Sequence, residues 1–336
     1  MIKNILGVSA GNGVILYPFK NQLIANIEIR PDYLIKGQPI QWHLNFEQPF
    51  YRTWNPDLKN VEVIVGHPKC GHSSMFALSR GKQFTSHVDE PSLTLFFKAV
   101  SHYQPKIFLL ENLPKFLDSF DDIRNLFENY TLTLLHKSVS EFGNSQVSRK
   151  RLIVIGLRKD YYRESTFRTL HDVFQITKPT TTKVLLANLP QNGHIKESIE
   201  DIITMYSGYK ISLTDAKQFW QDNPKLRHWP VKEGKMNTAP GVYINRFNDI
   251  PLTVRKTNRQ FNPDGEQMSP RELARIQGIP DDFKLLDSYP GVTTTTLINK
   301  GRITVANTPP MEIPKWFGIK LRRLKYLFFK DPQSLQ

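Results

Sequence analysis

The chain changes abruptly in character over Val63-Ile64-Val65-Gly66-His67-Pro68-Lys69-Cys70-Gly71-His72-Ser73-Ser74, where an apolar run gives way to glycine, proline and small polar residues. This pattern predicts a buried strand that ends in a loop, and it places Cys70 on that loop. Open α/β sheets carry their functional residues at the carboxyl ends of their strands. Cys70 is therefore a candidate nucleophile, and a small buried side chain is the alternative.

Two further apolar runs meet polar loops in a similar way. Residues 106–110 precede Glu111-Asn112, and residues 151–156 follow a basic loop. Such near-continuous apolar strands suit a sheet that is covered on both faces. Between the first two strands, the apolar residues of Pro91–Tyr103 have the spacing of a helix. The order strand, helix, strand predicts a doubly wound, Rossmann-like α/β domain.

Length and composition limit the class of protein. A chain of 336 residues with 39% hydrophobic residues predicts one large domain and a smaller one. We find no apolar stretch near the ~20 residues that span a bilayer, and the start of the chain lacks the pattern of a signal peptide. We therefore expect a cytoplasmic protein, associated with the nucleoid if it is bacterial, without a membrane partner. A single cysteine excludes an intramolecular disulfide and a cysteine-clustered metal site, and we expect no metal.

The charge balance favours a polyanionic partner. Lys and Arg number 45 against 31 Asp and Glu, which leaves a formal net charge of +14. The basic residues cluster at 149–151, at 255–259 and at 320–325, as a long nucleic-acid groove would require. A solvated basic surface is the alternative, and the last cluster could be the polar face of a terminal helix.

Changes in the pattern of apolar residues along the chain indicate where the domains lie. Residues 162–260 lack a sustained strand rhythm, so we expect a second, irregular domain there. Ser269-Pro270-Arg271-Glu272 then has the pattern of a helix start, with Ser269 as N-cap, and Gly278 ends that helix. Residues 314–330 are expected to pack back on the first domain. The predicted divisions are a first domain over 1–163, a second over 164–296 and a returning segment over 297–336.

Near the start, Ser9-Ala10-Gly11-Asn12-Gly13 follows the apolar stretch Ile5–Val8, and Glu28 ends the next apolar run. Glycines after a first strand let the backbone approach a nucleoside cofactor, and an acid after the next strand can accept hydrogen bonds from ribose hydroxyls. An ordinary tight turn is the alternative for these glycines.

Glu111 ends the second long strand, much as Cys70 follows the first. If the two strands are parallel neighbours, the carboxyl group and the thiol lie side by side. A thiolate nucleophile paired with a carboxylic acid suits an electron-poor heterocycle, which is protonated at one atom and attacked at another. A helix cap or a surface turn is the alternative interpretation of Glu111-Asn112.

Together these motifs resemble those of the cytosine-5 DNA methyltransferases. Pro68-x-Cys70 is similar to the nucleophile loop of that family, and Leu110-Glu111-Asn112-Leu113 to its Glu-Asn-Val segment. The Gln146 to Gly156 stretch resembles the Gln-x-Arg-x-Arg segment and the strand after it. The most specific match is Ser269-Pro270-Arg271-Glu272-Leu273-Ala274-Arg275-Ile276-Gln277-Gly278-Ile279-Pro280-Asp281-Asp282-Phe283. Val305-Ala306-Asn307-Thr308-Pro309-Pro310 resembles the closing Gly-Asn-x-Val-Pro segment.

The resemblance implies an enzyme that uses S-adenosyl-L-methionine to methylate carbon 5 of a cytosine flipped out of duplex DNA. It assigns catalysis to Cys70, Glu111, Arg149 and Arg151. It assigns cofactor binding to Ser9, Gly11, Gly13, Glu28 and Asn307. Residues 1–163 would form the catalytic domain and the second domain would recognise the target. We also expect the protein to act as a monomer and to belong to a restriction-modification system.

The chain departs from the family pattern at several positions. The usual Asp-x-Phe before the first glycine is Gly7-Val8-Ser9, and Asn45 is the nearest stand-in for an adenine-binding Asp. Lys69 replaces the proline that precedes the nucleophile, which we expect to free the loop. Two alternatives therefore stay open: a non-catalytic DNA-binding relative of the same fold, and a methyltransferase that acts on cytosine in RNA.

Overall fold

The computed structural model describes residues 3–11, 13–28, 41–43, 58–69, 91–119, 124–146, 149–161, 180–188, 195–198, 218, 221–222, 242–245, 248–254, 259–261, 266–283 and 294–328. By its contacts, the chain divides into two compact units. The first unit comprises Met1–Gly143, Arg149–Gln175 and Pro309–Gln336, and the second comprises Asn144–Ser148 and Ile176–Thr308. The chain therefore passes through the second unit briefly before it returns to the first at Arg149.

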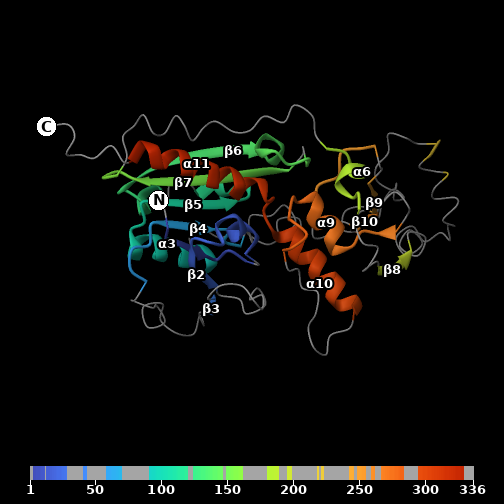
Figure 1. Ribbon diagram of the computed structural model, residues 1–336, viewed down its shortest axis with the longest axis horizontal. Coiled ribbons are helices and arrows are strands. Elements are labelled where there is room, and N and C mark those ends of the chain that lie inside the picture. Colours follow the sequence, from blue (N-terminus) through green and yellow to red (C-terminus); the bar gives the residue numbers. More distant parts are fainter. Residues whose placement is uncertain are drawn as a thin grey trace. The chain divides into compact units, whose positions relative to one another are not determined.

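The first unit is built on a sheet with the strand order β3-β2-β1-β4-β5-β7-β6, counted over the described residues (Figure 1). Neighbours from β3 to β5 are parallel, whereas β7 is antiparallel to both β5 and β6. The strands are β1 (Ile5–Val8), β2 (Leu23–Glu28), β3 (Gln41–His43), β4 (Val63–Gly66), β5 (Ile107–Asn112), β6 (Tyr130–Ser138) and β7 (Lys150–Arg158). This architecture confirms the predicted doubly wound, Rossmann-like fold.

Both faces of this sheet are covered, which explains the near-continuous apolar strands. One face packs against α3 (Pro91–Tyr103) and η5 (Pro114–Ser119), around a cluster that includes Phe96, Phe108 and Phe127. The rings of Phe96 and Phe108 meet edge to face with centroids 5.8 Å apart. The helix predicted over Pro91–Tyr103 is confirmed.

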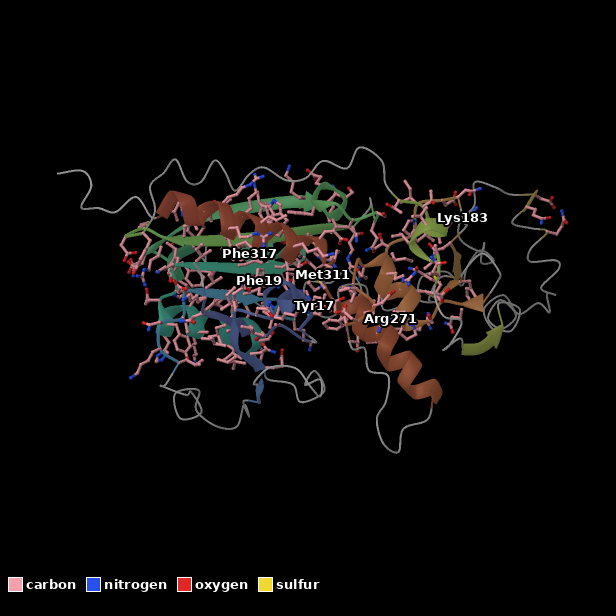
Figure 2. The ribbon with its side chains drawn as sticks, in the orientation of Figure 1. Tyr17, Phe19, Lys183, Arg271, Met311 and Phe317 are labelled. Carbon is pink, nitrogen blue, oxygen red and sulfur yellow. The ribbon has the colours of Figure 1, made fainter. Side chains whose placement is uncertain are left out.

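The opposite face packs against η1 (Val14–Phe19), η6 (Val139–Phe142) and the terminal helix α11 (Glu312–Phe328). Figure 2 labels Phe19 and Phe317, whose rings lie edge to face with centroids 6.1 Å apart. Trp316 is fully buried against the ring of Phe142, at 5.2 Å. Burial of these aromatic side chains holds α11 on the sheet, as predicted for residues 314–330. The returning segment begins at Pro309 rather than at residue 297, because residues 297–308 belong to the second unit.

The second unit contains a smaller sheet in the order β8-β11-β10-β9, again over the described residues. Its elements are α6 (Thr182–Leu185), β8 (Ile195–Ser198), β9 (Val242–Ile244), β10 (Arg259–Phe261), β11 (Glu266–Gln267), α9 (Pro270–Ile276) and α10 (Thr294–Asn307). In the part of the chain that the structure describes, we find no helix with the length and apolarity that a bilayer crossing demands.

Helix α9 begins as the sequence predicts. Glu272 N donates to Ser269 Oγ at 3.2 Å, and Ser269 N donates to Glu272 Oε2 at 2.6 Å, so the capping box is complete. Gly278 follows with a φ of 71°, a left-handed conformation that glycine adopts without strain. Arg271, labelled in Figure 2, donates to Pro280 O at 3.2 Å and to Phe283 O at 2.9 Å, which holds the turn after the helix.

Candidate active site

Strand register places two titratable side chains at one edge of the sheet. β4 and β5 are parallel, and Gly66 pairs with Leu110. The next residues, His67 and Glu111, therefore emerge beside each other. A Cβ on Gly66 would overlap the Phe96 ring of α3 and lie 2.7 Å from Val8 O of the neighbouring strand β1, so the packing around the end of β4 requires glycine there.

Glu111 is fully buried and has a basic side chain at each carboxylate oxygen. Its Oε1 lies 2.8 Å from Arg151 Nε, and its Oε2 contacts Nδ1 of His67. Burial by itself raises the pKa of Glu111, but the charges of His67, Arg151 and Arg149 outweigh burial and hold the pKa below its usual range. Glu111 is therefore an oriented carboxylate inside the protein rather than a surface cap.

The residues that lead into Cys70 are anchored, although Cys70 itself lies outside the described residues. Three contacts hold this backbone: His67 N donates to Ser9 O at 3.3 Å, Asn112 Nδ2 donates to Pro68 O at 3.4 Å, and Lys69 N donates to Ser92 Oγ at 2.9 Å. The loop therefore leaves the sheet in a defined direction. Asn112, the residue after Glu111, takes part in setting it.

Lys69 is tied to the fold by a bond that proline could not make, because proline has no backbone N–H. The acceptor, Ser92 Oγ, belongs to α3 and is buried. The Ser92 carbonyl also accepts a hydrogen bond from Ser9 Oγ at 2.8 Å. Lys69 was expected to free the loop, but its backbone N–H is held by the Ser92 hydroxyl. Ser92 also holds Ser9, in the loop after β1, through its carbonyl.

The loop after β1 is built from left-handed backbone. Ser9, Gly11 and Gly13 have φ values of 51°, 61° and 80°. Gly11 N donates to Glu28 Oε2 at 2.9 Å, and the Glu28 side chain is buried at the end of β2. A Cβ on Gly11 would meet no atom of the described residues within 4 Å, so they leave this side of the loop open to an approaching group. A buried carboxylate beside an open glycine loop fits a nucleoside with free ribose hydroxyls.

The remaining predicted residues fall in different places. Arg149 is buried, and its carbonyl accepts from Val139 N at 2.8 Å. Asn307 is the exposed last residue of α10, in the second unit, so its cofactor role stays a prediction. Asn45 lies outside the described residues.

Two residues of this site were missed by the motif analysis. His67 could have been found from register alone, because it follows an apolar strand at the position that matches Glu111 on the next one. Ser92 offers no comparable signal. Its role depends on where α3 lies against two loops that are distant in sequence.

A family model matches this chain over residues 47–296, which is most of its length, and that model describes the C-5 cytosine-specific DNA methylases. The chain belongs to this family. The resemblance found in the sequence motifs is thereby confirmed. It accounts for the pairing of a strand that leads toward Cys70 with a strand that contains Glu111.

Curated relatives include several Type II methyltransferases. The chain is 25% identical over 249 residues to M.SsoII of Shigella sonnei, a match that covers 68% of this chain and 57% of that relative. It is 26% identical over 267 residues to M.NgoPII of Neisseria gonorrhoeae, covering 72% and 74%. The match to M.MthTI of Methanothermobacter thermautotrophicus is 24% identical over 318 residues and covers 86% and 84%. The chain thus spans little more than half of M.SsoII and most of the other two.

Solved structures share the fold at low identity. The methyltransferase EhMeth of Entamoeba histolytica has a TM-score of 0.65 and 13% identity, with 97% of this chain and 99% of that chain covered. The Dnmt2 methyltransferase of S. pombe has a TM-score of 0.59 and 13% identity, with 96% and 98% covered. These similarities show that this chain shares its fold with the two solved methyltransferases.

Proposed function

We propose that this protein transfers a methyl group from S-adenosyl-L-methionine to carbon 5 of a flipped-out cytosine in duplex DNA, through a covalent adduct with Cys70. One observation carries the proposal: Glu111 is buried and oriented by Arg151 at 2.8 Å, on the strand beside the one that leads into Cys70. Membership in the family of C-5 cytosine-specific DNA methylases supports methylation of cytosine carbon 5 in DNA.

The reaction follows from the chemistry of cytosine. Carbon 5 is a weak nucleophile, so the ring must gain electron density before it can accept a methyl group. The Cys70 thiolate would form a bond to carbon 6 while Glu111 gives a proton to ring nitrogen 3, which makes carbon 5 part of an enamine. Carbon 5 would then form its bond to the methyl group. Removal of the proton on carbon 5 expels the thiolate, and ring nitrogen 3 returns its proton to Glu111, which restores the aromatic ring. Arg151 orients Glu111, and we assign the base oxygen to Arg149.

Residues of the first unit would hold the cofactor. The Glu28 carboxylate would accept hydrogen bonds from ribose hydroxyls, since each carboxylate oxygen accepts more than the single bond from Gly11 N. The backbone from Ser9 to Gly13 would lie against the nucleoside. When bound, the cofactor supplies an electrophilic methyl group.

Duplex DNA is the proposed substrate, supported by the net charge of +14 and by the family description. We assign the first unit to catalysis and the second unit to target recognition, so the boundaries of the two units replace those placed from the sequence at 163/164 and 296/297. Flipping the cytosine would give Cys70 access to carbon 6, which is inaccessible in a stacked base. A DNA substrate also implies that the protein acts in the compartment that holds the DNA.

The test has two stages. Sequencing that reports 5-methylcytosine, applied to DNA from cells that express the chain, should reveal methylation in one recurring sequence context. A duplex with that context and 5-fluorocytosine at the target should then form a covalent complex, because fluorine blocks the elimination step. Cys70→Ala should form no complex while it keeps its thermal stability and DNA affinity. A complex that persists in Cys70→Ala would refute the assignment of the nucleophile.

A further inference from the structure

His67 and Arg151 each contact one oxygen of the Glu111 carboxylate. Arg151 Nε lies 2.8 Å from Oε1, and Nδ1 of His67 contacts Oε2. The side chains of His67 and Arg151 are 13% and 12% exposed, whereas that of Glu111 is fully buried. The carboxylate is therefore held on one side by a permanent cation and on the other by a group that can gain or lose a proton.

This arrangement creates a difficulty for general acid catalysis. Arginine stays protonated at all relevant pH values, so Arg149 and Arg151 favour the ionised form of Glu111 throughout. Together with His67 they lower its pKa against the opposing effect of burial. An ionised carboxylate carries no proton to deliver. Glu111 needs a nearby source of a proton at neutral pH, and imidazole is the side chain that ordinarily exchanges one there.

We propose that His67 is a positioning residue that also stores the proton delivered by Glu111. This inference rests on the proposed methyl transfer. As the thiolate bonds to carbon 6, a proton moves from His67 Nδ1 to Glu111 Oε2, and the carboxyl group gives a proton to ring nitrogen 3. When the ring nitrogen later gives its proton back, the proton returns through Glu111 to His67. The pair thus ends each cycle as it began, and the proton lost from carbon 5 leaves by another route.

The surroundings of the pair agree with this role. Among the described residues, the groups that face it are Arg151 from β7, Arg149 just before β7, and the Ser9 carbonyl after β1, which accepts from His67 N at 3.3 Å. The hydrogen bond to Ser9 holds the backbone of His67, and the imidazole contacts the Glu111 carboxylate.

The first test compares the wild type with His67→Asn, whose amide nitrogen can replace the Nδ1 donor but cannot titrate. Single-turnover methyl transfer to DNA is measured over about pH 6 to 8. In His67→Asn, Glu111 must take its proton from water, so the ratio of variant to wild-type rate should fall with pH, approaching about tenfold per pH unit. The ratio cancels the titration of Cys70. His136→Asn, on an exposed position of β6, is the matched control and should follow the wild type.

A purely structural role for His67 would lower the rate equally at every pH, so a constant ratio would overturn the proposal. The second test needs no activity: NMR titration of the His67 imidazole in the wild type and in Glu111→Gln. Loss of the facing carboxylate should shift the imidazole titration down by about one pH unit or more. An unchanged titration would also overturn the proposal. If the wild type methylates no DNA but the titration shifts, the pair exists and only the proposed function has failed.

Discussion

Gln146 Nε2 donates a hydrogen bond of 2.9 Å to Gln277 Oε1, across 131 residues of sequence. Both side chains are fully buried within the second unit. Gln146 Oε1 accepts from Val254 N at 2.9 Å, and Gln277 Nε2 donates to Val305 O at 3.1 Å. Two amides therefore connect four segments, one of which is the short passage of the chain that precedes Arg149. Such buried polar networks are costly to break, because each member loses its partner without gaining water.

Gln146→Met should lower the free energy of unfolding by about 2 kcal/mol, since it removes the donor to Gln277 Oε1 and the acceptor of Val254 N in a buried site. Methionine has a similar size, so packing changes little. Chemical denaturation measures the loss. Gln218→Met is the control, because Gln218 is exposed and bonds only to Asp222 in the described residues, and its stability should stay within about 0.5 kcal/mol of wild type. Equal effects of the two substitutions would contradict a stabilising network.

Glu111→Gln should destabilise the protein in a pH-dependent way. The pKa of Glu111 is lowered in the folded state, so its contribution is present above the ordinary carboxyl range and is lost as pH falls through the folded pKa. We expect a cost of about 2–3 kcal/mol near neutral pH, where the variant leaves buried cations without their counter-charge. In acid the wild-type carboxyl is itself neutral, so the difference should shrink. Thermal melting of both proteins across pH checks this, and a difference that grows in acid would contradict it.

The bond from Lys69 N to Ser92 Oγ should appear as coupling between two substitutions. Ser92→Ala removes the acceptor and Lys69→Pro removes the donor, each at a cost of about 1 kcal/mol from this bond. The double variant can lose this bond only once. Lys69→Pro should therefore destabilise Ser92→Ala by about 1 kcal/mol less than it destabilises the wild type. Urea unfolding of the four proteins measures the cycle. Strictly additive penalties would mean that the bond contributes nothing.

Lys69→Met removes the side-chain charge of Lys69 and keeps its backbone N–H. Methionine keeps the N–H that Ser92 Oγ accepts, so the loop should stay anchored. An adjacent ammonium favours the thiolate, and its loss should slow adduct formation on 5-fluorocytosine DNA and shift the pH profile upward. Unchanged rate and profile would show that the charge of Lys69 is incidental.

Basic residues at the site edge of the sheet should contribute to DNA affinity through phosphate contacts. Lys150 is exposed at the start of β7, whereas Arg151 is paired with Glu111. Lys150→Gln should reduce the slope of log affinity against log salt by about 0.9, which corresponds to one phosphate. Lys159→Gln alters an exposed lysine beyond the opposite end of β7 and is the control. Equal slopes for Lys150→Gln and wild type would place the bound phosphates elsewhere.

Much of the fold was predictable because its signals are local. The helix over Pro91–Tyr103, the strand ends at Gly66 and Asn112, and the capping box at Ser269 all depend on residues a few positions apart. The antiparallel direction of β7 was not indicated, since an apolar run reads the same in either direction. That direction places the start of β7, and with it Arg151, beside Glu111.

The site was predictable only as a set of residue types. Cys70, Glu111, Arg149 and Arg151 were nominated from motifs, but the motifs do not say which cation pairs with which oxygen. The contact of His67 with Oε2 and that of Arg151 with Oε1 follow from strand register. Gln146 was noted only as the first residue of the stretch that resembles the Gln-x-Arg-x-Arg segment. The structure shows that its side chain connects buried segments.

By itself, the sequence determined where strands and helices begin and end and which polar residues follow the strands, because those features arise from the conformational and solvation preferences of neighbouring residues. The tertiary structure alone decided the partners of those polar groups. Asn112 reaches Pro68 across 44 residues, and Ser92 reaches Ser9 across 83. Such partners depend on strand order, register and helix packing, which set distances that no local pattern contains.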